Sequence, residues 1–152
     1  MADELKVEIQ GLDEVVDALR QIGVDAVAAV EAIALAAAGP VAQAVAAKAP
    51  GRIGEDIVTE TTEKSEKRVT VSVGPSRKQW FARFLEYGTT PHTVSARRER
   101  ALKLYGLGNV FRKSAGNTGT SATPFMRPAF DTGQDAAQQR AAAAAKKAVG
   151  AD

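Results

Sequence analysis

The residues that most often perform acid–base, nucleophilic or metal chemistry are few in this chain. The only histidine, His92, stands in a Thr-Thr-Pro-His-Thr segment with no acidic neighbour, and there is no cysteine. A zinc site would therefore need carboxylates from distant parts of the chain. The adjacent carboxylates at 13–14 and 55–56 stand where a helix or a turn should begin, a common place for acidic residues. We expect no enzyme, no metal site and a structural role for His92.

The glycines do not form a nucleotide site either. None of the glycines at 106, 108, 116 and 119 stands directly before Lys-Ser or Lys-Thr, as a phosphate loop requires, and no strand, GxGxxG and helix unit is present. We expect no cofactor.

One cluster does indicate a class of ligand. Positive side chains gather between residues 97 and 113, where Glu99 is the only acidic residue. They are Arg97, Arg98, Arg100, Lys103, Arg112 and Lys113. Arg and Lys attract backbone phosphates without reading the base sequence, and no helix-turn-helix, zinc finger or aromatic platform accompanies them. The cluster predicts nonspecific contact with double-stranded DNA; the alternative is a solvated basic surface.

Charge is unevenly distributed along the chain, although the net charge is only +2. Residues 1–66 hold 13 acidic and 5 basic side chains, whereas residues 67–152 hold 5 acidic and 15 basic ones. This asymmetry fits an anionic partner for the second half, or complementary faces that meet between copies of the chain.

The first half should form a strand and two helices. Apolar and polar residues alternate over 5–9, as in a half-buried strand, and apolar residues follow at helical spacing over 12–22. Asp25 is a candidate cap for an alanine-rich helix that reaches Lys48. Pro40 should kink this helix or make it restart. We expect the helix to lie flat on a sheet.

A hairpin should follow, with strands at 57–62 and 68–73 and an end at Gly74 and Pro75. Val69, Val71 and Val73 should face the helices, and the other face should be wet or at an interface. A short helix at 79–87 should then end at Gly88.

The last third should be irregular before a final helix. Residues 89–123 are expected to form a long, partly mobile loop with short strands at 101–105 and 110–112. Pro128 suits the first turn of a C-terminal helix over about 128–149, in which Gly133 is a weak point.

These elements predict one α+β domain over residues 1–152: an antiparallel sheet with the N-terminal helices packed on one face and a C-terminal Ala-rich helix. The absence of cysteine fits a reducing cytoplasm. We expect no signal peptide and no membrane partner, because no uninterrupted apolar stretch approaches the roughly 20 residues of a span. An alanine-rich core is thin, which favours oligomers.

Two strings, FARFLEYGTTPH at 81–92 and ATPFMRPAFD at 122–131, carry a family likeness. With GLDEVVDAL at 11–19 and AKAP at 47–50, the chain resembles the phage neck family typified by the tenth gene product of lambdoid siphophages, which includes tail-completion proteins. The turn after Pro50 departs from the family pattern. The core or interface residues of these motifs are Trp80, Phe81, Phe84, Leu85, Glu86, Tyr87, Gly88, Thr89, Pro124, Phe125, Met126, Arg127 and Pro128. We expect Phe84 and Phe125 in the core, and Glu86 to bond backbone amides or Arg127.

The resemblance implies a structural virion protein at the head–tail junction, assembled in the host cytoplasm. Such a subunit would form a ring, of about six copies, between the head–tail connector and the tail tube or terminator proteins. The basic cluster would then approach the DNA channel. Two alternatives stay open: a tail terminator that caps the tail tube, and a standalone nonspecific nucleic-acid-binding protein.

Overall fold

The computed structural model describes residues 5–7, 12–21, 25–65, 68–96, 101–104 and 110–150. The α+β class expected from the sequence is the one that forms, with antiparallel sheets and a C-terminal helix. Where a single domain was expected, the chain divides into two compact units. We call Met1–Ala82 with Pro124–Asp152 the body, and Arg83–Thr123 the ribbon unit.

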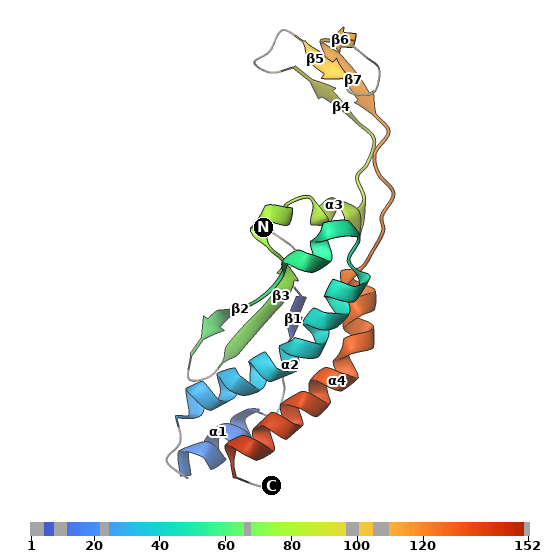
Figure 1. Ribbon diagram of the computed structural model, residues 1–152. Coiled ribbons are helices and arrows are strands. Elements are labelled where there is room, and N and C mark those ends of the chain that lie inside the picture. Colours follow the sequence, from blue (N-terminus) through green and yellow to red (C-terminus); the bar gives the residue numbers. More distant parts are fainter. Residues whose placement is uncertain are drawn as a thin grey trace. The chain divides into compact units, whose positions relative to one another are not determined.

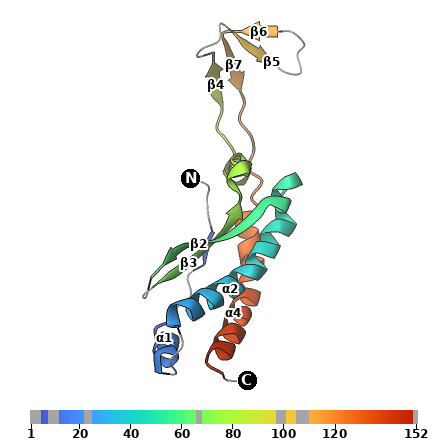
Figure 2. The ribbon, with the colours of Figure 1, turned by 60° about the vertical axis from the view of Figure 1, so that its left-hand side comes forward.

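The body combines a small sheet with long helices (Figure 1). Its elements are β1 (Leu5–Val7), α1 (Leu12–Gln21), α2 (Ala26–Lys48), the 3-10 helix η1 (Gly51–Asp56), β2 (Ile57–Lys64), β3 (Val69–Pro75), the 3-10 helix η2 (Arg77–Gln79) and α4 (Met126–Ala148). The sheet is antiparallel in the order β1-β3-β2. Helix α2 lies against β2 and β3, and α4 runs antiparallel beside α2 (Figures 1 and 2).

The central strand β3 provides most of the sheet's contribution to the core. Val69, Val71 and Val73 are buried, as their alternation predicted. The expectation of a wet or interfacial opposite face is wrong at Ser72, which is also buried and whose hydroxyl lies 3.2 Å from that of Thr62. The strand also extends through Gly74 to Pro75, because Pro75 still lies opposite Ile57 in the β2 ladder.

Helix α2 begins where the sequence predicted. The Asp25 carboxylate accepts hydrogen bonds from the amides of Val27 and Ala28, at 3.1 and 3.2 Å. The helix then runs through Pro40 as one element, so the expected restart is wrong. Contacts with the sheet and with α4 hold the helix on both sides of Pro40, and they outweigh the loss of one backbone hydrogen bond.

Small residues line the contact between α2 and α4. The buried positions of α4 recur every three or four residues, at Met126, Ala129, Gly133, Ala137 and Ala141. A Cβ atom added at Gly133 would lie 3.2 Å from Cα of Val41 and 3.4 Å from the carbonyl oxygen of Pro40. Gly133, expected only as a weak point of the helix, therefore lies where the backbone of α2 leaves little room for a side chain on α4.

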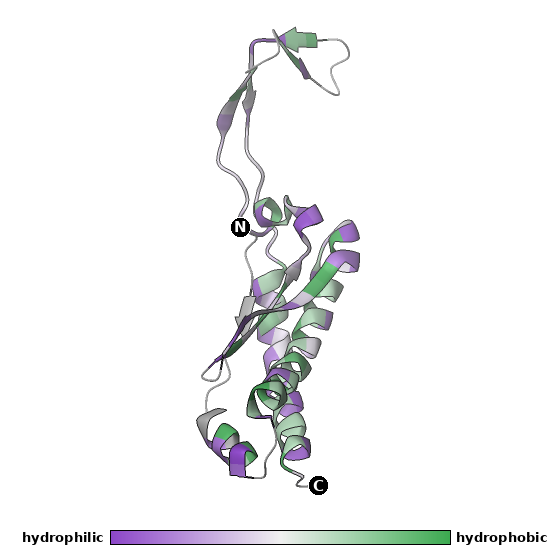
Figure 3. Ribbon diagram, turned by 90° about the vertical axis from the view of Figure 1, so that its left-hand side faces the viewer, coloured by the Kyte–Doolittle hydropathy of each residue, from purple (hydrophilic) through white to green (hydrophobic). Residues whose placement is uncertain are grey.

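Helix α2 is long and apolar enough to cross a membrane, judged by length and composition alone. Glu31 and Gln43 interrupt its apolar run. The helices of the body are green or pale green over much of their length in Figure 3. Within the body, the apolar character of α2 is accounted for by its place between the sheet and α4, where Ile33, Val41 and Val45 are fully or almost fully buried.

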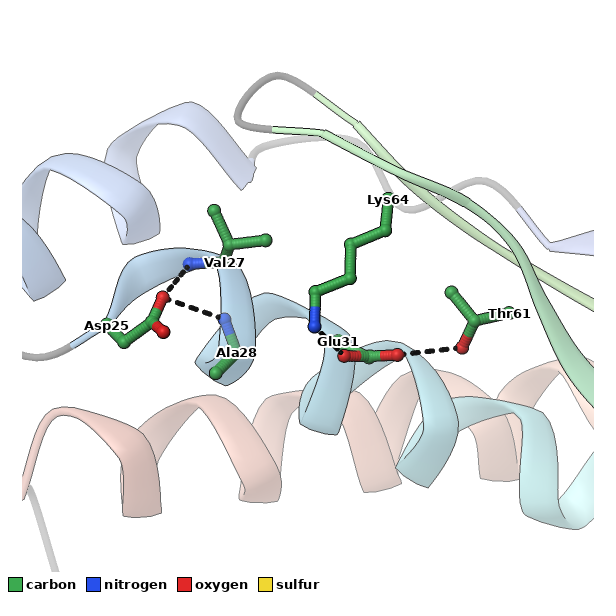
Figure 4. Close-up of polar contacts among 6 residues, drawn as sticks. All are labelled: Asp25, Val27, Ala28, Glu31, Thr61 and Lys64. Carbon is green, nitrogen blue, oxygen red and sulfur yellow. Dashed lines mark hydrogen bonds and ion pairs between the residues drawn. The ribbon is translucent and has the colours of Figure 1, made fainter.

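One polar connection joins α2 to the sheet (Figure 4). The Glu31 carboxylate accepts hydrogen bonds from the ammonium group of Lys64 at 2.5 Å and from the hydroxyl of Thr61 at 3.0 Å. The bond from Lys64, and then that from Thr61, hold the pKa of Glu31 below its ordinary value. The same bond raises the pKa of Lys64.

The ribbon unit consists of a short helix and two nested pairs of antiparallel strands. Helix α3 (Ala82–Tyr87) leads into β4 (His92–Ser95), and β5 (Leu102–Leu104), β6 (Val110–Arg112) and β7 (Ser114–Asn117) follow. Strand β4 pairs with β7, and β5 pairs with β6. The strands expected near 101–105 and 110–112 are confirmed. The expectation of an irregular loop over 89–123 is wrong for β4 and β7.

Candidate nucleic-acid interface

The ribbon unit is closed at its base by two glycines that other residues cannot replace without strain. Gly88 and Gly119 have φ angles of +72° and +82°. A Cβ atom at Gly88 would lie 2.6 Å from the Thr120 carbonyl oxygen, and one at Gly119 would overlap the carbonyl oxygen of Thr89. Between them, Thr89 and Thr120 exchange backbone hydrogen bonds of 2.9 and 3.1 Å. These bonds bring two segments of the chain together just after α3.

These two segments, residues 89–96 and 114–120, form what we call the stalk. His92 lies opposite Asn117 and Ser95 opposite Ser114, and the ladder continues with a bond from the Ala96 amide to the Lys113 carbonyl. Every residue of β4 is exposed, and so is all of β7 except Ala115, which is half-buried. Among the described residues of this unit, no element covers either face of the stalk.

Charge is divided sharply between the stalk and the segment it carries, residues 97–113, which we call the tip. The stalk has no Lys, Arg, Asp or Glu. The tip has six Lys or Arg and one acidic residue, Glu99, for a net charge of +5. The ribbon unit as a whole is also +5, because Arg83 and Glu86 cancel, and the body is −3.

The structure brings part of the predicted DNA-contact cluster together. Lys103 lies on β5, Arg112 on β6 and Lys113 directly after it, and all three are exposed. Arg97, Arg98 and Arg100 lie outside the described residues.

Positive charge is presented on both faces of the β5–β6 pair. Lys103 lies opposite Phe111, whereas Arg112 lies opposite Leu102, and residues that follow one another in a strand point to opposite faces. Phe111 itself is 59% exposed.

The aromatic motif at 83–89 is more exposed than the sequence suggested. Phe84 is 39% exposed and Tyr87 59%, so the expectation of a core position for Phe84 is wrong. Ala82 and Glu86, one helical turn apart, take the buried side of α3, and Phe84 lies halfway between them on the other side. The Arg83 guanidinium carbon lies 5.5 Å from the Phe84 ring centroid. Leu85 is half-buried.

A shallow depression of about 490 Å³ lies beside these rings within the ribbon unit. It is lined by Arg83, Phe84, Tyr87, Gly88, Thr89, Thr90 and His92. His92 makes a local contact there, with Nδ1 3.0 Å from the Thr90 carbonyl oxygen. Since a carbonyl can only accept, Nδ1 carries the proton and the imidazole helps to fix the turn into β4.

The motif residues of the body divide into exposed and buried groups. Trp80 is 69% exposed and packs edge to face on Phe81, with ring centroids 6.1 Å apart. Phe125 is only 2% exposed and Met126 is also buried, so the core position predicted for Phe125 is confirmed. Pro124, Arg127 and Pro128 are exposed around them.

The described residues contain no group of three or more His, Cys, Asp or Glu side chains placed to hold a metal ion. The feature that sequence reasoning missed is the stalk. Its signal was present as two runs without Lys, Arg, Asp or Glu, residues 89–96 and 114–120, on either side of a basic segment. No family model, no curated protein and no solved structure matches this chain.

Proposed function

We propose that this chain is a structural virion protein of a long-tailed phage, a ring-forming neck or tail-completion subunit that joins the tail to the head around the DNA channel. The observation that carries the proposal is the division of charge in the ribbon unit, a neutral two-stranded stalk that bears a tip of net charge +5. The virion context rests on the resemblance of residues 81–92 and 122–131 to the neck family.

The tip suits DNA that moves past it. Lys103, Arg112 and Lys113 are exposed and lie on a strand pair with positive charge on both faces. Contacts from Lys and Arg to phosphates do not depend on base sequence and weaken with salt. A channel protein needs this kind of contact, since every sequence of the genome must pass.

Ring formation is supported by composition and charge. The core relies on alanine, with Ala34, Ala37, Ala38, Ala129 and Ala137 all buried, and alanine contributes little transfer energy when it is buried. The body is acidic and the ribbon unit basic, so heterologous contacts between copies are electrostatically favourable. The ring would lie between the connector and the tail tube or terminator proteins.

Charge reversal of the tip tests the proposal in phage. Arg112→Glu with Lys113→Glu should sharply lower the titre and leave filled heads and complete tails unjoined in micrographs. The matched control is Lys146→Glu with Lys147→Glu, which makes the same charge change at exposed positions of α4. Normal titres for the tip variant, with the protein present in particles, would contradict the DNA-channel role. Tails of uncontrolled length in the deletion strain would instead indicate the terminator.

A standalone nucleic-acid-binding protein is the second candidate, because the ribbon unit alone carries a net charge of +5. Such a protein would bind double-stranded DNA tightly as a free subunit at physiological salt. A neck subunit should bind weakly until it is assembled, because only the ring gathers many tips on one duplex.

A further inference from the structure

Strands β4 and β7 lack most of the features that normally keep sheet edges apart, and the one proline of the stalk, Pro91, stands just before β4. An edge strand presents unpaired N–H and C=O groups, which proteins protect with charged residues, bulges or proline. The body protects its long edge strand β2 in this way, with Glu60, Glu63 and a change of register between Thr61 and Glu63. Strands β4 and β7 have no Lys, Arg, Asp or Glu, and their register is regular.

The stalk also lacks a core of its own. A two-stranded ribbon is at best marginally stable in water, and stability usually comes from a third strand or from a covering layer. Both faces of β4 are exposed, and among the described residues of the ribbon unit no third strand joins the ladder. Added neighbours at the edges would satisfy the outward backbone groups and extend the sheet.

We propose that the stalks of neighbouring copies pair edge to edge, β4 of one copy against β7 of the next, and close into an antiparallel barrel. This inference rests on the ring of the proposed function and names its contact. The partner is a second copy because one stalk offers two different edges that run in opposite directions. Under cyclic symmetry, β4 and β7 of adjacent copies are then antiparallel, and a heterologous contact of this kind closes.

The composition of the stalk fits identical neighbours. Residues directly opposite one another share a face, so Thr93, Ser95, Ser114 and Gly116 lie on one face and His92, Val94, Ala115 and Asn117 on the other. Neither set contains Lys, Arg, Asp or Glu, so pairing between copies brings no two of these charges together. The charged residues of the ribbon unit lie in the tip and in α3 instead.

Cysteine cross-linking tests the contact cleanly, because the natural chain has no cysteine. Full-length Ser95→Cys and Ser114→Cys chains are co-expressed, and purified oligomers are treated with mild oxidant or with a bismaleimide that spans about 8 Å, the reach of a diagonal cross-strand pair. We expect cross-linked dimers that contain one chain of each kind. Co-expressed Ser95→Cys and Ala115→Cys chains are the matched control, since these residues lie on opposite faces, and should give several-fold less dimer.

The outcomes separate the two proposals. Rings that form without mixed Ser95 to Ser114 cross-links would overturn the barrel and leave the neck function standing. Efficient cross-linking of Ser95→Cys chains to one another would indicate two-fold pairing of β4 with β4, which also overturns the barrel. Absence of any oligomer of the natural chain, with and without double-stranded DNA, would count against the ring itself.

Discussion

At Glu31, two hydrogen bonds to one carboxylate join α2 to β2, and the direction of the pKa shifts fixes their dependence on pH. The pKa of Glu31 is lowered in the folded state, so its contribution to stability is present above the ordinary carboxyl value and is lost as the pH falls through the lowered value. The pKa of Lys64 is raised, so its contribution is lost as the pH rises through that raised value.

Glu31→Gln should therefore lower the melting temperature at neutral pH by a small amount, and the difference from the natural protein should shrink as the pH falls toward 3. The side chain of Lys64 is 49% exposed and that of Glu31 24%, so solvent screens the pair and the effect is modest. Thermal unfolding followed by circular dichroism across this range measures it. Glu60→Gln, on the exposed part of β2, is the control; an equal, pH-independent loss in both variants would argue against the Glu31 contact.

At Gly133, the close approach of α2 and α4 makes side-chain size decisive. Gly133→Leu should destabilise the body by about 1–3 kcal/mol, because the side chain must displace the backbone of Val41 and Pro40. Gly133→Ala should have a much smaller effect, since about 1 kcal/mol of helix propensity offsets a tight contact. Urea unfolding measures both. Ala136→Leu, on the exposed side of α4, should be nearly neutral, and a similar loss there would refute the argument.

For the strands, residue composition decided what could be predicted. Strand β3 alternates Val with polar residues, and β6 contains the short apolar run Val-Phe. These patterns predicted both strands. Strands β4 and β7 read HTVS and SAGN, which carry turn residues and almost no apolar signal. They pair because Gly88 and Gly119 bring the two segments of the chain together. This constraint is long-range, so a pattern read over a few consecutive residues does not contain it. The helix α2 continues through Pro40 for a similar reason, since tertiary contacts hold the helix on both sides of this residue.

The closure of the stalk gives a prediction for this element alone. Gly119→Ala should disorder the stalk, because alanine at a positive φ would also overlap the Thr89 carbonyl. Hydrogen exchange should accelerate at Thr89 and Thr120, while amides of α2 and α4 stay protected. Gly116→Ala is the matched control, since its φ is not in the left-handed region and nothing lies within 4 Å of the added Cβ. Equal exchange in the two variants would contradict this account.

For the whole molecule, binding to double-stranded DNA should fall steeply with salt and should not depend on sequence. Replacing Lys103, Arg112 and Lys113 with glutamine should reduce the slope of log affinity against log salt concentration by up to about three phosphate contacts. Fluorescence anisotropy at several salt concentrations measures this. Glutamine at Arg140, Lys146 and Lys147 of α4 is the control. An unchanged slope in the tip variant would place the DNA contact elsewhere.

The uncharged stalk beneath a positive tip has a consequence for the timing of assembly. Strands in a sheet are about 5 Å apart, so two-stranded stalks side by side would hold neighbouring tips roughly 10 Å from one another, close to the Debye length at physiological salt. Mutual repulsion of these tips opposes closure until counterions or a polyanion compensate it. A short duplex should therefore promote self-association in sedimentation experiments, because it compensates the charge of the tips and acts as a template. Genomic DNA would then supply the negative charge that allows the ring to close.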